Sequence, residues 1–525
     1  MDAPRLDDLL IPLRAASSGR PAFVLEDGTT LGAADFDAMV ARTAGWLRGQ
    51  GIGSGDRVAV WLVNRIEWLA ILFALARLDA TLVAVNTRYR SSELHHILLS
   101  SNAKMLVMQP DFRRIDFPAV LSSLDASDLA SLTTVAVLGE VGDPILGRTT
   151  VPFDPANATP DAGGRGDPDA GLIIFTTSGT TKAPKLVLHP QRTLALHSQR
   201  AAVAYGFDAP DAGFLAAMPF CGVFGLNAAL AAIAGGATSH VVAMFDAEDT
   251  ARRVEEGRLT HLFGSDEMFR RLVGLGRERL ASLRVCGFGA FTPGLSDFLA
   301  DAAEAGLPLC GLYGSSEVNA LFSIQPADMT RGERLKGGGR PASDDADVRV
   351  RNAETGELLP DGEPGELEIR APTNFVGYDG NAEATAAAVD PDGYFRTGDV
   401  GYTRGNGTFV YVARAGDAIR LSGFLTDPAE IEDVLKGLDG VADAQVVGVE
   451  VDGQTRPVAF VIAEGGGASE GAIVAGARER LAAYKVPLRV FTLEAFPTTQ
   501  SANGLKIQRA KLRSMAAERL ATENA

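Results

Sequence analysis

The sequence has few cysteines and histidines, which limits the sites it can form. Its 525 residues include 3 cysteines and 6 histidines. The cysteines Cys221, Cys286 and Cys310 lie far apart and show neither metal-ligand spacing nor a paired framework. The histidines form no ligand cluster along the chain, and we expect each of them to be structural. They are His95, His96, His189, His197, His240 and His261.

Excess positive charge and long apolar runs are also missing. The net charge of -17 argues against a surface that coats nucleic acid or anionic lipid, so an anionic ligand must be held by a local positive site. The longest early apolar stretch, WLAILFALA at residues 68–76, is too short to span a bilayer. The N-terminus, MDAPRLDDLL, is acidic where a signal peptide is basic. We therefore expect a cytoplasmic protein without a transmembrane segment.

The pattern of apolar residues predicts an α/β fold. Short apolar runs such as DRVAVWLV, KMLVMQP, LTTVAVL and GLIIFTT alternate with helical patterns such as ELHHILLSS, which is typical of largely parallel sheets. Residues 157–171, rich in Gly and Asp, look like an exposed linker. From about residue 340, short strands with turn signals indicate a β-rich subdomain.

A second unit is predicted after Arg414. PAEIEDVLKGL and EGAIVAGARERLAA are typical of helices, and AQVVGVEV and RPVAFVIAE of strands, which suggests an α+β domain of about 110 residues. The expected organisation is an N-terminal domain of layered α/β subdomains over residues 1–413, a hinge at 414–417 and a small mobile C-terminal domain over 418–525.

The stretch FTTSGTTKAPK, residues 175–185, has the composition of an anion-binding loop. Thr177, Ser178, Thr180 and Thr181 offer hydroxyl donors, and Gly179 permits close approach to the backbone. Two lysines add charge, Lys182 within the loop and Lys185 at its end. The loop does not match the P-loop spacing GxxxxGK[ST]. On this segment alone, a polar hairpin turn is an equally good interpretation.

Four further motifs decide between these interpretations. They are GLYGSSE at 311–317, DGYFRTGDVG at 392–401, VARAGDAIRLSG at 412–423 and NGLKIQRAKLR at 503–513. With the loop, this ordered series resembles the adenylate-forming superfamily of acyl-CoA synthetases, peptide-synthetase adenylation domains and luciferases. The resemblance extends from about residue 85 to the terminal lysine motif. It implies that ATP converts a carboxylate to an acyl-adenylate, that pyrophosphate leaves, and that a thiol then takes the acyl group.

The resemblance assigns a nucleotide site. It implies that the loop hydroxyls and Lys185 hold the β- and γ-phosphates, that Glu317 and Thr180 bind Mg²⁺, and that Tyr313 stacks on adenine. Asp399 and Arg414 are implied to contact the ribose. Lys506 is implied to bridge the attacking carboxylate and the α-phosphate, where charge builds up. The remaining residues of this set are Gly289, Ala290, Gly314, Ser315 and Ser316.

The resemblance also implies a mobile C-terminal domain and a CoA site. That domain would rotate about Gly416 after adenylation, withdrawing Lys506 and admitting the CoA thiol, and a glycine would allow the change of backbone angles. Ser422 and Gly423 would let the pantetheine arm pass.

The acyl pocket is predicted from mostly apolar residues, as a hydrophobic acid requires. Simple core packing explains the individual apolar members about equally well. The predicted lining residues are Phe220, Gly222, Val223, Phe224, Asn227, Phe288 and Gly311.

Four departures from the family pattern qualify this assignment. Lys182 stands where the loop usually has a second glycine, and Leu505 separates Gly504 from Lys506, which are usually adjacent. Ser316 replaces a threonine, and Gly222 stands where many acyl-CoA synthetases carry a histidine. The last change bears on the substrate, and the choice between a fatty and an aromatic acid stays open.

The sequence favours an ATP-dependent carboxylic acid:CoA ligase that uses ATP, Mg²⁺ and CoA. One alternative is a stand-alone adenylation enzyme that loads a carrier protein. Another is a non-catalytic nucleotide-binding sensor, which retention of both Glu317 and Lys506 disfavours.

Overall fold

The computed structural model describes most of the chain in two compact units. The described residues are 3–16, 19–89, 91–112, 115–161, 163–177, 184–290, 295–415, 419–421, 424–426, 428–451, 454–464, 467, 469–481, 483–501 and 504–523. Unit 1 comprises Met1–Gly289, Ala302–Asp347 and Arg370–Phe395. Unit 2 comprises Ala290–Asp301, Val348–Ile369 and Arg396–Ala525. Residues 348–369 and 396–413 thus group with the C-terminal residues, whereas the boundary at 414–417 stays a prediction.

The first sheet of unit 1 has a parallel centre. Its strand order is β21-β11-β10-β4-β3-β5-β8-β9, and only the β10–β11 and β11–β21 pairs are antiparallel among its described pairings. The strands are β3 (Arg57–Trp61), β4 (Thr81–Ala84), β5 (Met105–Met108), β8 (Thr134–Val137), β9 (Thr149–Pro152), β10 (Gly171–Thr177), β11 (Lys185–Pro190) and β21 (Gly377–Tyr378). The central strands β4 and β5 are buried throughout, because helices cover both faces of such a sheet.

The second sheet of unit 1 contains the order β18-β17-β16-β15-β14-β12-β13-β1-β2. From β1 to β16 its strands pair in parallel, and β17 and β18 are antiparallel. The bounds are β1 (Phe23–Val24), β2 (Thr30–Leu31), β12 (Gly213–Ala216), β13 (Thr238–Val241), β14 (His261–Ser265), β15 (Val285–Gly289), β16 (Leu309–Ser315), β17 (Asn319–Ile324) and β18 (Gly338–Pro341).

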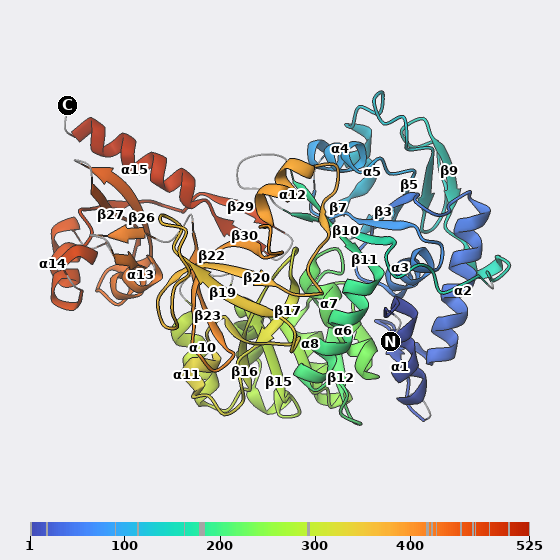
Figure 1. The fold of residues 1–525 in the computed structure, drawn as a ribbon, viewed down its shortest axis with the longest axis horizontal. Coiled ribbons are helices and arrows are strands. Elements are labelled where there is room, and N and C mark those ends of the chain that lie inside the picture. Colours follow the sequence, from blue (N-terminus) through green and yellow to red (C-terminus); the bar gives the residue numbers. More distant parts are fainter. Residues whose placement is uncertain are drawn as a thin grey trace. The chain divides into compact units, whose positions relative to one another are not determined.

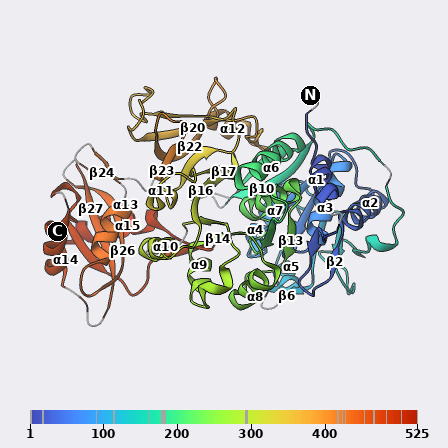
Figure 2. The ribbon, with the colours of Figure 1, turned by 90° about the horizontal axis from the view of Figure 1, so that it is seen from below.

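Helices pack against both sheets of unit 1. Figures 1 and 2 show α6 (Gln191–Tyr205) beside α7 (Val223–Gly235), whose residues are nearly all buried. An apolar helix of this kind belongs in the interior between layers. The other helices and short elements of unit 1 are η1 (Leu6–Leu9), α1 (Leu10–Ala16), α2 (Ala33–Gly49), α3 (Ile66–Arg77), α4 (Ser91–Ser100), β6 (Asp111–Phe112), β7 (Ile115–Asp116), α5 (Phe117–Ser122), η2 (Pro155–Asn157), α8 (Ala247–Gly257), α9 (Asp266–Val273), η3 (Arg277–Leu280), α11 (Arg331–Arg334) and α12 (Ala382–Ala388). Helix α10 (Ser296–Glu304) has its first residues in unit 2 and its last in unit 1.

Besides residues 290–301, unit 2 contains a four-strand segment and the α+β part predicted after Arg414. The segment has the order β19-β20-β22-β23, with β19 (Asp347–Arg351), β20 (Gly365–Arg370), β22 (Phe395–Thr403) and β23 (Phe409–Arg414). The α+β part contains β24 (Ile419–Leu421), β25 (Phe424–Thr426), α13 (Pro428–Lys436), β26 (Val441–Val451), β27 (Gln454–Ala463), α14 (Glu470–Arg480), η4 (Ala483–Lys485), β28 (Arg489–Thr492), β29 (Thr498–Ser501), β30 (Gly504–Ile507) and α15 (Arg509–Glu523).

Strand β26 contributes residues to both apolar clusters of this C-terminal part. Successive side chains of a strand point to opposite faces, so Ala444 and Val446 enter one apolar cluster and Val447 and Val449 the other. Helices α13 and α15 both pack against β26, as Figure 2 shows.

The structure confirms the predicted α/β class with a large N-terminal and a smaller C-terminal part. Residues 157–171 are mostly exposed, as predicted, but they are anchored. Arg48 forms an ion pair with Asp161 at 2.7 Å, and Gln191 donates to the carbonyl of Asp167 at 3.1 Å. Every helix in the described part of the chain is too short or too polar to cross a lipid bilayer.

Candidate active site

Glu317 lies at the centre of a polar cluster in unit 1. It follows β16, and its half-buried carboxylate accepts a hydrogen bond from the Tyr378 hydroxyl at 3.0 Å. The Nζ of Lys185 lies 4.4 Å from the centre of the Tyr378 ring, within the range of a cation–π contact. Since β21 pairs with β11, Tyr378 stands opposite Val187, two residues after Lys185. Tyr378 therefore contacts both Lys185, which ends the predicted phosphate loop, and Glu317, the predicted metal ligand.

Backbone contacts hold this cluster in place. The Phe375 amide donates to the carbonyl of Glu317 at 2.7 Å. His189 of β11 contacts the carbonyl of Ser316 through Nε2 at 2.7 Å, and because a carbonyl only accepts, Nε2 carries the proton. Burial lowers the pKa of His189 to about 4, so its ring is neutral at neutral pH. His189 therefore fixes the backbone beside Glu317.

Strand β16 requires its glycines for close packing. A Cβ on Gly311 would lie 2.5 Å from the carbonyl oxygen of Lys336, and one on Gly314 would lie 2.5 Å from that of Asn319. Both distances are shorter than van der Waals contact. Tyr313 is 6% exposed, and its ring packs edge-on against Phe322 at 6.3 Å between centroids. Gly311, Tyr313 and Gly314 are thus closely packed along β16, which ends at Ser315.

Asn227, a predicted acyl-pocket residue, is fully buried and hydrogen-bonded. It donates to the Oδ1 of Asn319 at 3.3 Å and accepts from the Ala320 amide at 2.9 Å. Asn319 has a φ of 67°, in the left-handed region that asparagine tolerates better than most residues. Asn227 therefore supports the turn after Glu317, a contact that the sequence did not predict.

The other predicted acyl-pocket residues lie after the end of β12 and at the end of β15. Phe220 is 1% exposed and lies 5.8 Å from the Trp68 ring, and Phe224 is 6% exposed. Gly222 caps helix α7, whose first residue is the half-buried Val223. Phe288, Gly289 and Ala290 lie at the end of β15, where exposure increases from 2% for Phe288 to an exposed Ala290.

Asp399 and Arg414 face each other in unit 2. They are register partners in the antiparallel β22–β23 pair, and Nη1 of Arg414 lies 2.7 Å from Oδ1 of Asp399. The same Nη1 donates to the carbonyl of Thr397 at 2.9 Å. Gly398 has a φ of 67°, which glycine adopts without strain. The structure thus pairs the two residues that were predicted to contact one ribose.

Lys506 lies on β30 of the β29–β30 hairpin, opposite Thr499, just before helix α15. Several other predicted site residues lie outside the described residues. They are Ser178, Gly179, Thr180, Thr181, Lys182, Gly416, Ser422 and Gly423.

Sequence reasoning missed Tyr378. Tyr378 belongs to a two-residue strand whose pairing with β11 has no local signature. His189 was expected to be structural, and its contact with the carbonyl of Ser316 agrees with that expectation.

Comparison with known proteins shows which family the chain belongs to. Residues 14–379 match the AMP-binding enzyme family, and residues 430–503 match the AMP-binding enzyme C-terminal domain. The 3-[(3aS,4S,7aS)-7a-methyl-1,5-dioxo-octahydro-1H-inden-4-yl]propanoyl:CoA ligase of Mycobacterium tuberculosis is 32% identical over 477 residues, which are 89% of this chain and 90% of the relative. The feruloyl-CoA synthase of an Amycolatopsis species is 31% identical over 501 residues, 94% of this chain and 96% of the relative. The crystal structure of ATP-bound MatB from Rhodopseudomonas palustris has a TM-score of 0.82 at 26% identity and covers 98% of this chain and 99% of its own.

The chain therefore belongs to the AMP-binding enzyme family, in its adenylate-forming acyl-CoA ligase branch. It is an AMP-forming acid–CoA ligase, which couples a carboxylic acid to CoA at the expense of ATP.

Proposed function

We propose that this ligase activates a hydrophobic carboxylic acid, either a medium- or long-chain fatty acid or an aromatic acid. The supporting observation is the apolar character of the predicted acyl residues Phe220, Val223, Phe224 and Phe288. The names of the relatives, a feruloyl-CoA synthase and an indane-propanoyl ligase, also describe bulky, largely apolar acids. Gly222 stands where many acyl-CoA synthetases carry a histidine. The absence of that side chain is consistent with an acid whose apolar part occupies the space.

In the first half-reaction, a carboxylate oxygen attacks the α-phosphorus of ATP. The bond to the bridging oxygen breaks, and pyrophosphate leaves with the electron pair. We propose that Thr177, Ser178, Gly179, Thr180, Thr181 and Lys185 bind the pyrophosphate end. Lys506 would stabilise the charge that develops between the carboxylate and the α-phosphate. Tyr313 would lie against adenine, with Gly289, Ala290 and Gly314 to Ser316 around it.

Glu317 is suited to bind Mg²⁺. Carboxylate oxygens are preferred ligands of this ion, and within the described residues the carboxylate forms no ion pair with a cationic side chain. We propose that Glu317 and Thr180 hold Mg²⁺, which would neutralise phosphate charge. The Tyr378 hydroxyl would orient the carboxylate by occupying Oε1.

Asp399 and Arg414 are suited to the ribose. A carboxylate accepts hydrogen bonds from two adjacent hydroxyls, and the Arg414 guanidinium keeps the Asp399 side chain in one orientation.

In the second half-reaction, the thiol of CoA attacks the acyl carbonyl and AMP leaves. We propose rotation about Gly416 between the two steps, with Ser422 and Gly423 beside the pantetheine arm. The three cysteines are free and buried, so the protein requires no oxidising compartment, and we propose a cytoplasmic location.

The two half-reactions can be tested separately. We expect Lys506→Ala to nearly abolish pyrophosphate release, while thioester formation from supplied acyl-adenylate and CoA is largely retained. Lys511→Ala is the matched control, because Lys511 is an exposed lysine on the adjacent helix α15. Equal loss in both half-reactions would contradict the role of Lys506.

A panel of benzoates and straight-chain acids, assayed for pyrophosphate release with and without CoA, identifies the acid. Turnover that CoA does not accelerate would contradict CoA as the acceptor of the acyl group and would favour another acceptor.

A further inference from the structure

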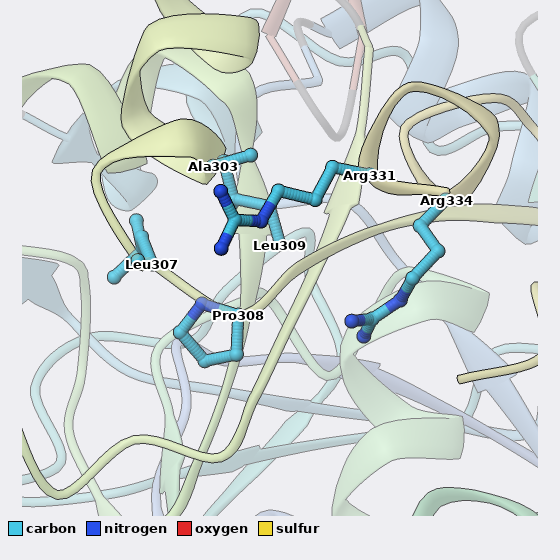
Figure 3. A pocket seen from close by; sticks show the side chains of 7 residues that line it. Ala303, Leu307, Pro308, Leu309, Arg331 and Arg334 are labelled. Atoms are coloured by element: carbon cyan, nitrogen blue, oxygen red, sulfur yellow. The ribbon is translucent and has the colours of Figure 1, made fainter. Parts of the chain in front are cut away.

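A cavity in unit 1 lies at the amino end of strand β16. Its volume is about 200 Å³, and Figure 3 shows its lining residues. One wall is the turn that leads into β16, with Leu307, Pro308 and Leu309, and the other is helix α11. Since α11 places Arg331 and Arg334 three residues apart, both side chains extend from the same side of the helix toward this turn. The cavity therefore combines an apolar wall with two guanidinium groups.

These two arginines have no carboxylate partner among the residues that the structure describes. Among the described residues, neither arginine forms an ion pair with a carboxylate, and Nε of Arg334 is buried without a hydrogen-bond partner. Arg331 donates a hydrogen bond from Nη1 to the carbonyl of Glu304 at 3.2 Å. An arginine keeps its charge at any physiological pH, and a buried N–H is normally paired. Arg331 is exposed and Arg334 is half-buried, so the group of this cavity that lacks a partner is Nε of Arg334.

A second cavity of unit 1 provides a contrast. Its volume is about 310 Å³, and it is also lined by two arginines, Arg252 and Arg253. Both are neutralised by Asp249, and Arg252 also pairs with Glu256 at 2.8 Å. Within the described part of the chain, carboxylates therefore pair with the arginines of the second cavity and not with those of the first.

The first cavity is separate from the active site. The parallel strands β14, β15 and β16 end at the edge that carries Gly289 and Glu317, whereas the cavity lies at Leu309, where β16 begins. Seven residues of extended strand separate these edges by roughly 20 Å. A ligand in this cavity would not occupy the residues proposed for ATP or the acid.

We propose that this cavity is a second binding site, which takes a small carboxylate with an apolar body. The carboxylate would be held by Arg331 and Arg334, whose planar guanidinium groups match its geometry. The apolar body would lie against Leu307, Pro308 and Leu309. The volume is below that of a typical cofactor pocket and admits a single ring or a short chain.

Ligand-observed fluorine NMR with 4-fluorobenzoate tests the proposal on the full-length protein without ATP, so that no turnover occurs. Arg334→Met keeps an unbranched, apolar stem and removes the guanidinium with its charge, and Arg331→Gln is the second variant. We expect each to weaken one binding component by about tenfold or more, as the loss of a charge-assisted hydrogen bond implies. The acid KM for pyrophosphate release should not change, which separates this site from the active site.

Arg478→Gln is the matched control, because it removes an equal charge from an exposed position of unit 2. It should bind 4-fluorobenzoate as the unmodified protein does. Equal binding by Arg331→Gln and the unmodified protein would overturn the proposal, even if Arg334→Met failed to fold. Competition by inorganic phosphate at the same concentration would overturn the carboxylate class, since phosphate makes no use of the apolar wall.

Discussion

Replacing Glu432 with alanine should destabilise the C-terminal part of unit 2 far more than replacing Glu430 in the same helix. The Glu432 side chain is 3% exposed, and its carboxylate accepts hydrogen bonds from both terminal nitrogens of Arg509, at 2.7 and 3.0 Å. It also accepts from the Val446 amide at 2.8 Å. Nη1 of Arg509 completes the cluster with a bond to the carbonyl of Val446 at 2.9 Å. This cluster joins α13, β26 and the first turn of α15.

The expected loss follows from what Glu432→Ala leaves behind. The Arg509 guanidinium, 18% exposed, would lose its counter-charge, and the Val446 amide would lose its acceptor. Removal of one partner of a buried ion pair costs about 3–5 kcal/mol. Glu430 is different, because its pair with Lys485 at 2.5 Å leaves the glutamate 53% exposed. A pair of that kind contributes roughly 0–1 kcal/mol.

Activity should fall with stability, because Arg509 begins the helix that directly follows Lys506 on β30. Loss of the Arg509 anchor would loosen the position of the lysine, so pyrophosphate release should fall more than thioester formation from supplied adenylate. Urea unfolding and thermal melting of both variants measure stability, and a decrease in melting temperature of roughly 12 °C or more is expected for Glu432→Ala in a domain of this size. Equal stability losses for Glu432→Ala and Glu430→Ala would refute this reasoning.

Three further predictions concern the active site and pH. Tyr378→Phe removes the hydroxyl that donates to Glu317 but keeps the ring, so the KM for Mg·ATP should rise about 2- to 10-fold while the KM for the acid stays constant. Burial lowers the pKa of His189 and of His197 to about 4, so the unfolded chain binds more protons between pH 6.5 and pH 4. Unfolding free energy measured in urea should therefore fall as the pH falls, by on the order of 2 kcal/mol per histidine at pH 5. On the hypothesis that the Lys182 ammonium contacts a phosphate of ATP, Lys182→Gly should raise the KM for ATP by a factor that corresponds to at most about 1.5–3 kcal/mol.

Each of these predictions has an outcome that contradicts it. A change in the acid KM of Tyr378→Phe would show that the tyrosine affects binding of the acid, which contradicts its proposed role in binding Mg·ATP. If His189→Gln retains the full pH dependence of stability between pH 7 and pH 5, the buried ring is not its source. An unchanged ATP KM for Lys182→Gly would show that this lysine faces solvent.

Much of the fold could be predicted because local patterns carry it. Apolar runs located β3, β5, β8 and β10, and helical periodicity located α4, α13 and α14 close to their observed bounds. The hairpin of β22 and β23 follows from short strands joined by turn residues, and it places Asp399 opposite Arg414. The family motifs identified the candidate site because they are short and continuous in sequence.

The sequence by itself therefore determined the class of elements, their order and the chemical groups available for ATP. Tertiary structure alone decided which groups meet. Tyr378 reaches Glu317 from 61 residues away, and Arg509 reaches Glu432 from 77 residues away. It also decided that, among the described residues, carboxylates pair with Arg252 and Arg253 in the second cavity but not with Arg331 and Arg334 in the first. The physical reason is that periodicity and turn chemistry act over a few neighbouring residues, whereas a hydrogen bond or an ion pair depends on the distance between side chains after distant strands and helices have packed.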